Sequence, residues 1–182
     1  YDPNAFANGI SAMDWEQLRD DPAHPLNNKV TGSAFPPGST FKIVTALAGL
    51  EAGIINKHTT VFCPGHFDLG GNRFHCWKDG GHGNVDVVKA LAQSCDVFFY
   101  KMAGNLGIER LAEMARRLGL GSNLDFDVPE VKAGLVPDQA WKRRERKQDP
   151  TWHPGETVNA VIGQGYMLAS PLHLVTMVAR AV

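Results

Sequence analysis

The feature that most constrains this 182-residue sequence is the Pro-Pro-Gly break at residues 36–38, which is followed at once by a helical pattern. Two prolines and a glycine cannot lie inside a regular helix or a central strand. From Ser39 to Ala52 apolar side chains recur at helical spacing, and Gly53 stands where a helix-ending glycine is expected. The pattern therefore predicts a helix over residues 39–52 that begins at Ser39.

Apolar residues at helical spacing also predict other helices, in several cases with a recognisable start or stop. These are a short helix within residues 13–18 and longer ones over residues 86–103, 108–118 and 170–182. Residues 59–83 are rich in glycine, histidine and cysteine and show no clear period, so we expect an irregular excursion there. Residues 120–154 are predicted to be rich in turns, and their cationic run at 142–147 to form a solvated face.

The overall composition excludes several classes of protein. Charged residues make up 20% of the chain, hydrophobic residues 43%, and the formal net charge is -1, so neither disorder nor nucleic-acid binding is favoured. A run of 18 or more apolar residues is absent, which argues against a membrane span within these residues. The length fits one domain with a real core.

Ser39 and Lys42 form a candidate pair of nucleophile and base. A serine hydroxyl becomes a good nucleophile only when a neighbouring base takes its proton, and residues three apart on a helix share one face. The free N–H groups at a helix N-terminus favour a developing oxyanion. Lys42 would have to be desolvated to act as a base, which the flanking Phe41 and Ile43 allow. The spacing alone is common, and the alternative is that Ser39 is an ordinary helix cap.

A family resemblance gives this pair its context. Residues 35–42 (FPPGSTFK) resemble the first active-site motif of class B penicillin-binding proteins, which are D,D-transpeptidases that cross-link peptidoglycan. Residues 1–4 (YDPN), 9–11 (GIS), 162–166 (IGQGY) and 170–171 (SP) are similar to the elongation-specific member of that class. The resemblance covers nearly the whole chain. It implies the α+β fold of penicillin-binding proteins and serine β-lactamases, with this chain as its mainly helical part.

The resemblance also assigns a second motif. Ser94-Cys95-Asp96 looks like the Ser-x-Asn triplet of the family, with aspartate in place of asparagine. Residues two apart on a helix point to opposite sides, so both outer side chains can face one cleft only if the backbone leaves regular helix there. By analogy, Ser94 would relay a proton between Lys42 and an amine, and Asp96 would bind Lys42 or the substrate. The alternative is a Ser94 hydroxyl bonded to its own helix.

The activity implied by the resemblance is acyl transfer through a Ser39 acyl-enzyme, with peptidoglycan stem peptides as substrates and β-lactams as inhibitors. A D,D-carboxypeptidase or β-lactamase, or a β-lactam sensor without turnover, stays open. The family implies cell-shape proteins as partners and a place on the periplasmic face of the bacterial inner membrane. The third family motif, Lys-Thr-Gly or Lys-Ser-Gly, is absent from the sequence. We therefore expect residues 1–182 to be a transpeptidase-domain fragment without the membrane anchor, the pedestal and the C-terminal strand, and to lack full activity alone.

All three cysteines fall close to several histidines, which suggests a metal site. Three thiolates and one imidazole are the ligands of a closed structural zinc site, and the resemblance supports a zinc here. The spacing is not that of a zinc finger, and no organic cofactor is indicated. Of the other histidines, His75 is less favoured and His66 stays possible; the competing interpretation is a disulfide between the first two cysteines with the third as a buried thiol. The predicted zinc ligands are Cys63, Cys76, His82 and Cys95.

Overall fold

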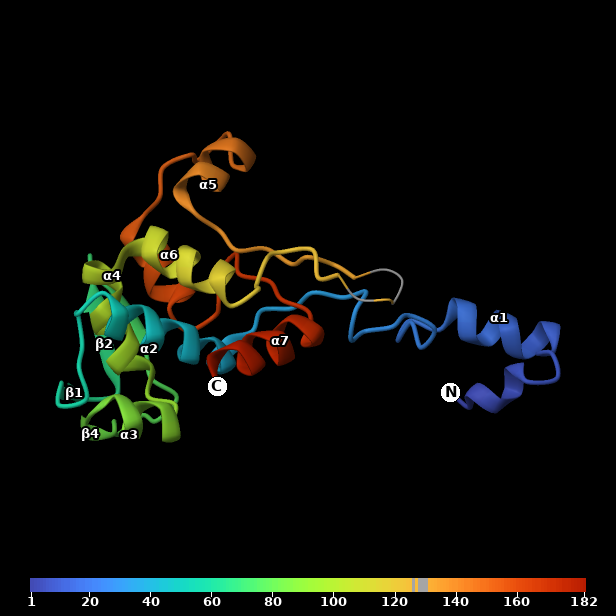
Figure 1. Ribbon diagram of the computed structural model, residues 1–182, viewed down its shortest axis with the longest axis horizontal. Helices are drawn as coiled ribbons and strands as arrows, with labels where there is room; N and C mark the ends of the chain where they lie inside the picture. Colours follow the sequence, from blue (N-terminus) through green and yellow to red (C-terminus); the bar gives the residue numbers. More distant parts are fainter. Residues whose placement is uncertain (126, 128–130) are drawn as a thin grey trace.

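The computed structural model describes residues 1–125, 127 and 131–182. It has the predicted α+β character: a helical body carries two small antiparallel sheets (Figure 1). The first residues, which include the short helix η1 (Pro3–Phe6) and helix α1 (Ala12–Asp20), extend away from this body and bury none of their helical side chains. The core and the candidate site therefore lie in the remainder of the chain.

Helix α4 (Asp96–Arg117) is the centre of the body. It packs against α2 (Lys42–Glu51) on one side and α6 (Pro154–Ala160) on another, and thirteen of its 22 residues are buried. The sequence predicts one helix over residues 86–103 and another over 108–118. The break between these two ranges is confirmed by a kink at Gly107, but the first range is itself divided by a break that the sequence did not predict. Helix α3 (Val87–Ala92) ends early, and α4 then runs on through a kink at Gly107, whose φ of 71° is open to glycine.

The predicted helix over residues 39–52 is confirmed, with one refinement. Its first turn is a 3-10 helix, η2 (Gly38–Phe41), and α2 continues directly from it to Glu51. The predicted terminal helix is also confirmed as α7 (Pro171–Ala181), where the Ser170 side chain accepts a hydrogen bond from the N–H of His173 and so caps the helix.

The prediction of an irregular excursion over residues 59–83 is wrong in part, because one antiparallel ladder encloses another there. Strand β1 (Val61–Cys63) pairs with β4 (Gly83–Val85), and between them β2 (His66–Leu69) pairs with β3 (Asn72–His75). The inner turn is Gly70-Gly71, both at positive φ, as a tight hairpin requires. Phe67 and Phe74 pack on Tyr100 of α4 with ring centroids 6.2 and 5.8 Å away, which fixes the hairpin to the body.

The turn-rich prediction for residues 120–154 missed helix α5 (Gln139–Glu145), and the solvated-face prediction for residues 142–147 is wrong for Lys142. The Lys142 side chain is fully buried, and its Nζ donates to Glu156 Oε1 at 2.6 Å and to Asp149 Oδ2 at 3.0 Å. Burial acts to lower the pKa of Lys142, but these hydrogen bonds outweigh it and the pKa is raised. The ion pair between Lys142 and Glu156 joins α5 to α6 and so fixes the position of the cationic run.

No helix in the described part of the chain is both long and apolar enough to cross a membrane.

Replacing Lys142 by methionine tests this anchor. Lys142→Met keeps the volume of the side chain but leaves the largely buried carboxylate of Glu156 without its cation. Breaking a buried ion pair in this way lowers the free energy of unfolding by about 3 kcal/mol. Urea denaturation of the intact protein measures the loss. Lys147→Met, on the exposed part of the same run, is the control and should change stability by less than about 0.5 kcal/mol. Equal effects of the two substitutions would contradict the assignment.

Candidate active site

The position of Ser39 is set by the turn that precedes α2. Gly38 takes a φ of 57°, and its N–H donates to the carbonyl oxygen of Gly163 at 2.9 Å. The chain before the turn is held as well, because Phe35 forms an antiparallel bridge with Ala169. Ser39 therefore lies in the first turn of η2, and three residues per turn bring Lys42 onto the same side of the helix.

Lys42 is the buried centre of the site. Its side chain is 1% exposed, and its Nζ donates to the carbonyl oxygen of Ser94 at 2.9 Å, to Ser94 Oγ at 2.9 Å and to Asp96 Oδ1 at 2.6 Å. A lysine ammonium has three donors, and all three are matched by acceptors. The predicted desolvation of Lys42 is thus present, together with an anionic neighbour.

The backbone leaves regular helix at the second motif, as the sequence predicts. Ser94 lies between α3 and α4 with a φ of 53°, which non-glycine residues rarely adopt, and Cys95 is the extended N-cap residue of α4. This break turns Ser94 and Asp96 toward the cleft, while Cys95 is fully buried on the other side. A strained φ at a functional site is common where the surroundings enforce it.

A chain of two hydrogen bonds joins Ser39 to Lys42 through Ser94. Ser94 Oγ donates to Ser39 Oγ at 2.9 Å and accepts from Lys42 Nζ, whereas the described residues show no direct hydrogen bond between Ser39 and Lys42. The sequence analysis expected Lys42 to contact Ser39 directly, whereas in the structure Ser94 lies between Ser39 and Lys42. Because a hydroxyl rotates freely, the same two bonds can carry a proton in either direction.

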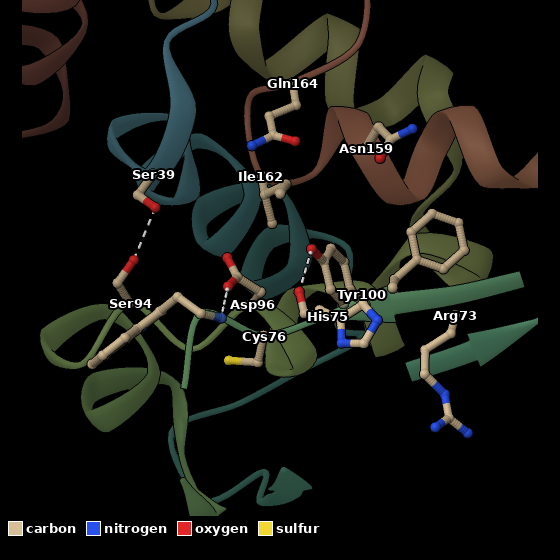
Figure 2. Close-up of a pocket in the computed structure, with 12 residues that line it drawn as sticks. Ser39, Arg73, His75, Cys76, Ser94, Asp96, Tyr100, Asn159, Ile162 and Gln164 are labelled. Atoms are coloured by element: carbon tan, nitrogen blue, oxygen red, sulfur yellow. Dashed lines mark hydrogen bonds between the residues drawn. The ribbon is translucent and has the colours of Figure 1, made fainter. Parts of the chain in front are cut away.

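These groups line a cleft of about 760 Å³, shown in Figure 2. Ser39 and Ser94 face each other at one end, and Gln164, Ile162 and Asn159 lie along one side of the cleft. This cleft brings together all four predicted catalytic positions, three of them in its lining and Lys42 beneath it.

Two residues of the cleft escaped the sequence analysis. The backbone N–H of Trp77 donates to Asp96 Oδ2 at 3.1 Å, so both oxygens of that carboxylate are held. Tyr100 donates its hydroxyl to the carbonyl oxygen of His75 at 3.2 Å, and burial raises the pKa of Tyr100. The only signal for Trp77 was its place beside a predicted metal ligand, Cys76, because a backbone donor has no signature in the sequence.

The four predicted metal ligands meet directly behind Ser94 and Asp96. Their ligand atoms all lie within 4.8 Å of one another, and all four residues are buried. His82 Nδ1 is 3.7 Å from Cys63 Sγ and 3.5 Å from Cys76 Sγ. A tetrahedral zinc with Zn–S near 2.3 Å and Zn–N near 2.0 Å requires separations of about 3.6 Å, and the two distances from His82 to the sulfurs match this value. All three cysteines are free, which disfavours the disulfide, and His66 and His75 lie outside the cluster.

The surroundings favour the thiolate form of Cys63 but disfavour that of Cys95. Burial acts to raise the pKa of Cys63, but the N–H groups of His82 and Gly65 that point at its sulfur outweigh this, and the pKa is lowered. Burial raises the pKa of Cys95 to about 12, and the nearby Cys63 and Cys76 add to the rise. A bound cation removes the repulsion among such thiolates. The second ring nitrogen of His82, Nε2, is buried and has no hydrogen-bond partner in the described residues.

Comparison with known proteins identifies the family. The family model for the penicillin-binding protein transpeptidase domain matches residues 1–182. The chain belongs to the penicillin-binding protein transpeptidase family. Among the relatives of this transpeptidase chain, the peptidoglycan D,D-transpeptidase MrdA of Escherichia coli K12 is 40% identical over 176 residues, which are 96% of this chain and 28% of that protein.

Solved structures agree with this assignment. The transpeptidase chain resembles PBP2 of Pseudomonas aeruginosa in complex with WCK 5153, with a TM-score of 0.88, 42% identity, and coverage of 98% of this chain and 41% of that one. It also resembles PBP2 of Helicobacter pylori in its complex with MreC, with a TM-score of 0.85, 39% identity, and coverage of 91% and 31%. The chain thus spans less than half of each relative, and it has the transpeptidase fold.

The contact between Gly163 and the Ser39 turn can be tested with paired glycines. A Cβ on Gly163 would clash with the Gly38 carbonyl oxygen and lie 2.7 Å from Phe41 Cβ, whereas one on Gly165 would meet only Asn159 Cβ at 3.5 Å. Both glycines have φ near 70°, so both substitutions carry the same backbone strain. Gly163→Ala should slow labelling of Ser39 by a fluorescent penicillin at least tenfold more than Gly165→Ala does. Equal rates would show that the turn does not depend on this contact.

Proposed function

We propose that this chain is the nucleophile-bearing part of a peptidoglycan D,D-transpeptidase that works through an acyl-enzyme on Ser39. The observation that carries the proposal is the hydrogen-bonded chain from Ser39 through Ser94 to the buried Lys42, which opens into a cleft of about 760 Å³. Family membership supports it, because relatives such as MrdA are D,D-transpeptidases by name.

In the first half of the reaction, Ser39 Oγ attacks the carbonyl carbon of the penultimate D-alanine of a stem peptide. The serine proton passes to Ser94 Oγ as the Ser94 proton passes to Lys42 Nζ. For this step Lys42 is the uncharged amine, whose two N–H groups keep Asp96 and the Ser94 carbonyl as acceptors while its lone pair faces Ser94 Oγ. The C–N bond to the last D-alanine then breaks, and the leaving nitrogen takes the proton back through Ser94. The product is an ester on Ser39 plus free D-alanine.

In the second half, an amine of a neighbouring stem peptide attacks the ester carbonyl and gives its proton to the same relay. The C–O bond to Ser39 breaks, and the serine recovers its proton. Asp96 holds Lys42 throughout, and the Trp77 N–H holds Asp96, so the lysine keeps one position while protons arrive and leave. β-Lactams enter by the same first step, in which opening of their ring leaves the acyl group on Ser39.

We also propose that Cys63, Cys76, His82 and Cys95 hold one structural zinc ion. The burial of all four donors and the two distances of 3.7 and 3.5 Å from His82 Nδ1 to Cys63 Sγ and Cys76 Sγ support this. The ion would supply charge compensation and a crosslink, and no step of the reaction runs through it. Because Cys76 precedes Trp77 and Cys95 separates Ser94 from Asp96, the crosslink would tie the hairpin segment to the turn that carries the relay.

The chain matches only 28% of the length of MrdA from E. coli, so the setting of the whole protein is also proposed. We infer a protein that acts at the periplasmic face of the bacterial inner membrane during cell-wall elongation. The complex of H. pylori PBP2 with MreC supports a cell-shape protein as partner. A hydrolytic D,D-carboxypeptidase or β-lactamase would share Ser39 and Lys42, and differs in passing the acyl group to water.

Intact mass after incubation with penicillin tests the nucleophile. The intact protein should gain the mass of one penicillin, with peptide mapping placing the adduct on Ser39. Ser39→Ala should show no adduct, whereas Ser33→Ala, just before the Pro-Pro-Gly turn, should react like the parent. With a thioester or peptide donor and D-amino acids as acceptors, transfer should exceed hydrolysis; rapid release to water would favour the hydrolase instead.

Elemental analysis tests the metal. We expect about one zinc per chain in the purified intact protein, with loss of zinc in Cys76→Ser and His82→Gln and a lower melting temperature. His75→Gln is the matched control, because His75 neighbours Cys76 in sequence but lies outside the cluster, so it should keep its zinc. Full zinc in His82→Gln, or none in the parent, would refute the site.

A further inference from the structure

The cationic run at residues 142–147 borders a surface hollow that has no role in the proposed reaction. Helix α5 projects from the body of the molecule (Figure 1). The hollow, of about 510 Å³, lies between Tyr166 and residues 145–149, at the C-terminal end of α5. We call it the cationic hollow. Its lining residues are Glu145, Arg146, Lys147, Gln148, Asp149 and Tyr166.

The two acids and the two cations that line this hollow differ in whether they form ion pairs. Glu145 is paired with Arg144, whose Nε lies 2.7 Å from Glu145 Oε1. The other wall acid, Asp149, is paired twice, with Lys142 Nζ at 3.0 Å and with His153 Nε2 at 2.9 Å.

Within residues 1–125, 127 and 131–182, by contrast, Arg146 and Lys147 form no ion pair. With Glu156, which shares Lys142 with Asp149, the four cations Lys142, Arg144, Arg146 and Lys147 face three acids, so the hollow and its ion-pair partners carry a net charge of +1.

The wall is also preorganised. The Arg146 guanidinium lies over the ring of Tyr166, 4.9 Å from its centroid, and 5.9 Å from the centroid of Trp141. These two rings pack on each other with centroids 5.0 Å apart, and the buried Lys142 fixes the segment beneath them. A guanidinium stacked in this way keeps its N–H edges available for a planar anion such as a carboxylate.

The cationic hollow is connected to the cleft by shared walls. Asn159 lines both the cleft and a smaller hollow of about 210 Å³, and Tyr166 lines both that smaller hollow and the cationic one. The cleft and the cationic hollow are thus both next to the smaller hollow, through Asn159 on one side and Tyr166 on the other.

We propose that the cationic hollow binds a carboxylate of an extended acidic peptide whose other end occupies the cleft at Ser39. This inference rests on the proposed function, because that function supplies a peptide substrate in the cleft. Arg146 and Lys147 act as specificity residues that favour acidic over neutral peptides. Tyr166 forms the wall over which the chain passes.

Competition for Ser39 between two synthetic peptides tests the proposal in the intact protein. Both peptides end in D-Ala-D-Ala; one carries free side-chain carboxylates, and in the other these are amidated. The readout is the ratio of their inhibition constants against a fluorescent penicillin, so a general loss of activity cancels. One charge-assisted hydrogen bond predicts a preference of about tenfold for the acidic peptide in the unaltered protein.

Single substitutions locate the effect. Arg146→Gln and Lys147→Gln should each reduce the preference to about threefold or less, and Lys147 has no packing role that the fold needs. Arg143→Gln removes the same charge from an exposed position of α5 outside the hollow and should keep the preference. Arg144→Gln should reduce it although Arg144 lies outside the lining, because it frees Glu145.

The outcomes distinguish a failure of the cationic hollow as a peptide-binding site from a failure of the proposed function. No preference in the unaltered protein, or an equal loss in Arg143→Gln, overturns the hollow as a binding site. Binding to anionic phospholipid vesicles that Arg146→Gln abolishes, with the peptide preference kept, would assign the hollow to lipid and also overturn the proposal. Failure of penicillin to label Ser39 refutes the proposed function instead, and fluorescence anisotropy of the labelled acidic peptide then still decides whether the hollow binds it.

Discussion

The burial of the Lys42 amine is the constraint on which the rest of the site depends. A cation with 1% of its side chain exposed is tolerated only if each of its donors finds an acceptor and its charge finds a partner. Ser94 and Asp96 supply these acceptors from a segment more than fifty residues away. The need to satisfy Lys42 therefore holds α2 and the start of α4 in one register, and that register also brings Ser94 to Ser39.

This requirement explains the unusual backbone between α3 and α4. Ser94 must offer both its carbonyl and its hydroxyl to Lys42, which it does at a φ of 53° that an ordinary helix residue never takes. The neighbouring Cys95 is drawn into the cysteine-histidine cluster, and the Trp77 N–H holds Asp96 from the hairpin side. Strain at one residue is thus stabilised by contacts from three directions.

The sequence predicted the parts of the structure that depend on local pattern. The Pro-Pro-Gly break placed Ser39, and the spacing argument at residues 94–96 foresaw the departure from helix there. Zinc ligands were chosen by residue type, and the same four residues converge. The sequence analysis did not predict features that depend on tertiary contacts. These are the burial of Lys142, the short paired strands on either side of Gly70, and the backbone N–H of Trp77 that binds Asp96. None of these has a periodicity or a side-chain signature, because each is created by what packs against it.

The central claim is that the proton of Ser39 travels through Ser94 to Lys42, and one rate constant tests it most directly. Ser94→Gly removes the relay hydroxyl at a φ that glycine adopts without strain, so the turn itself should persist. The account predicts that the second-order rate constant for acylation of Ser39 by penicillin falls about a hundredfold or more, the usual contribution of a proton-transfer group. A rate within about threefold of the parent would show that Ser39 reaches Lys42 without the relay.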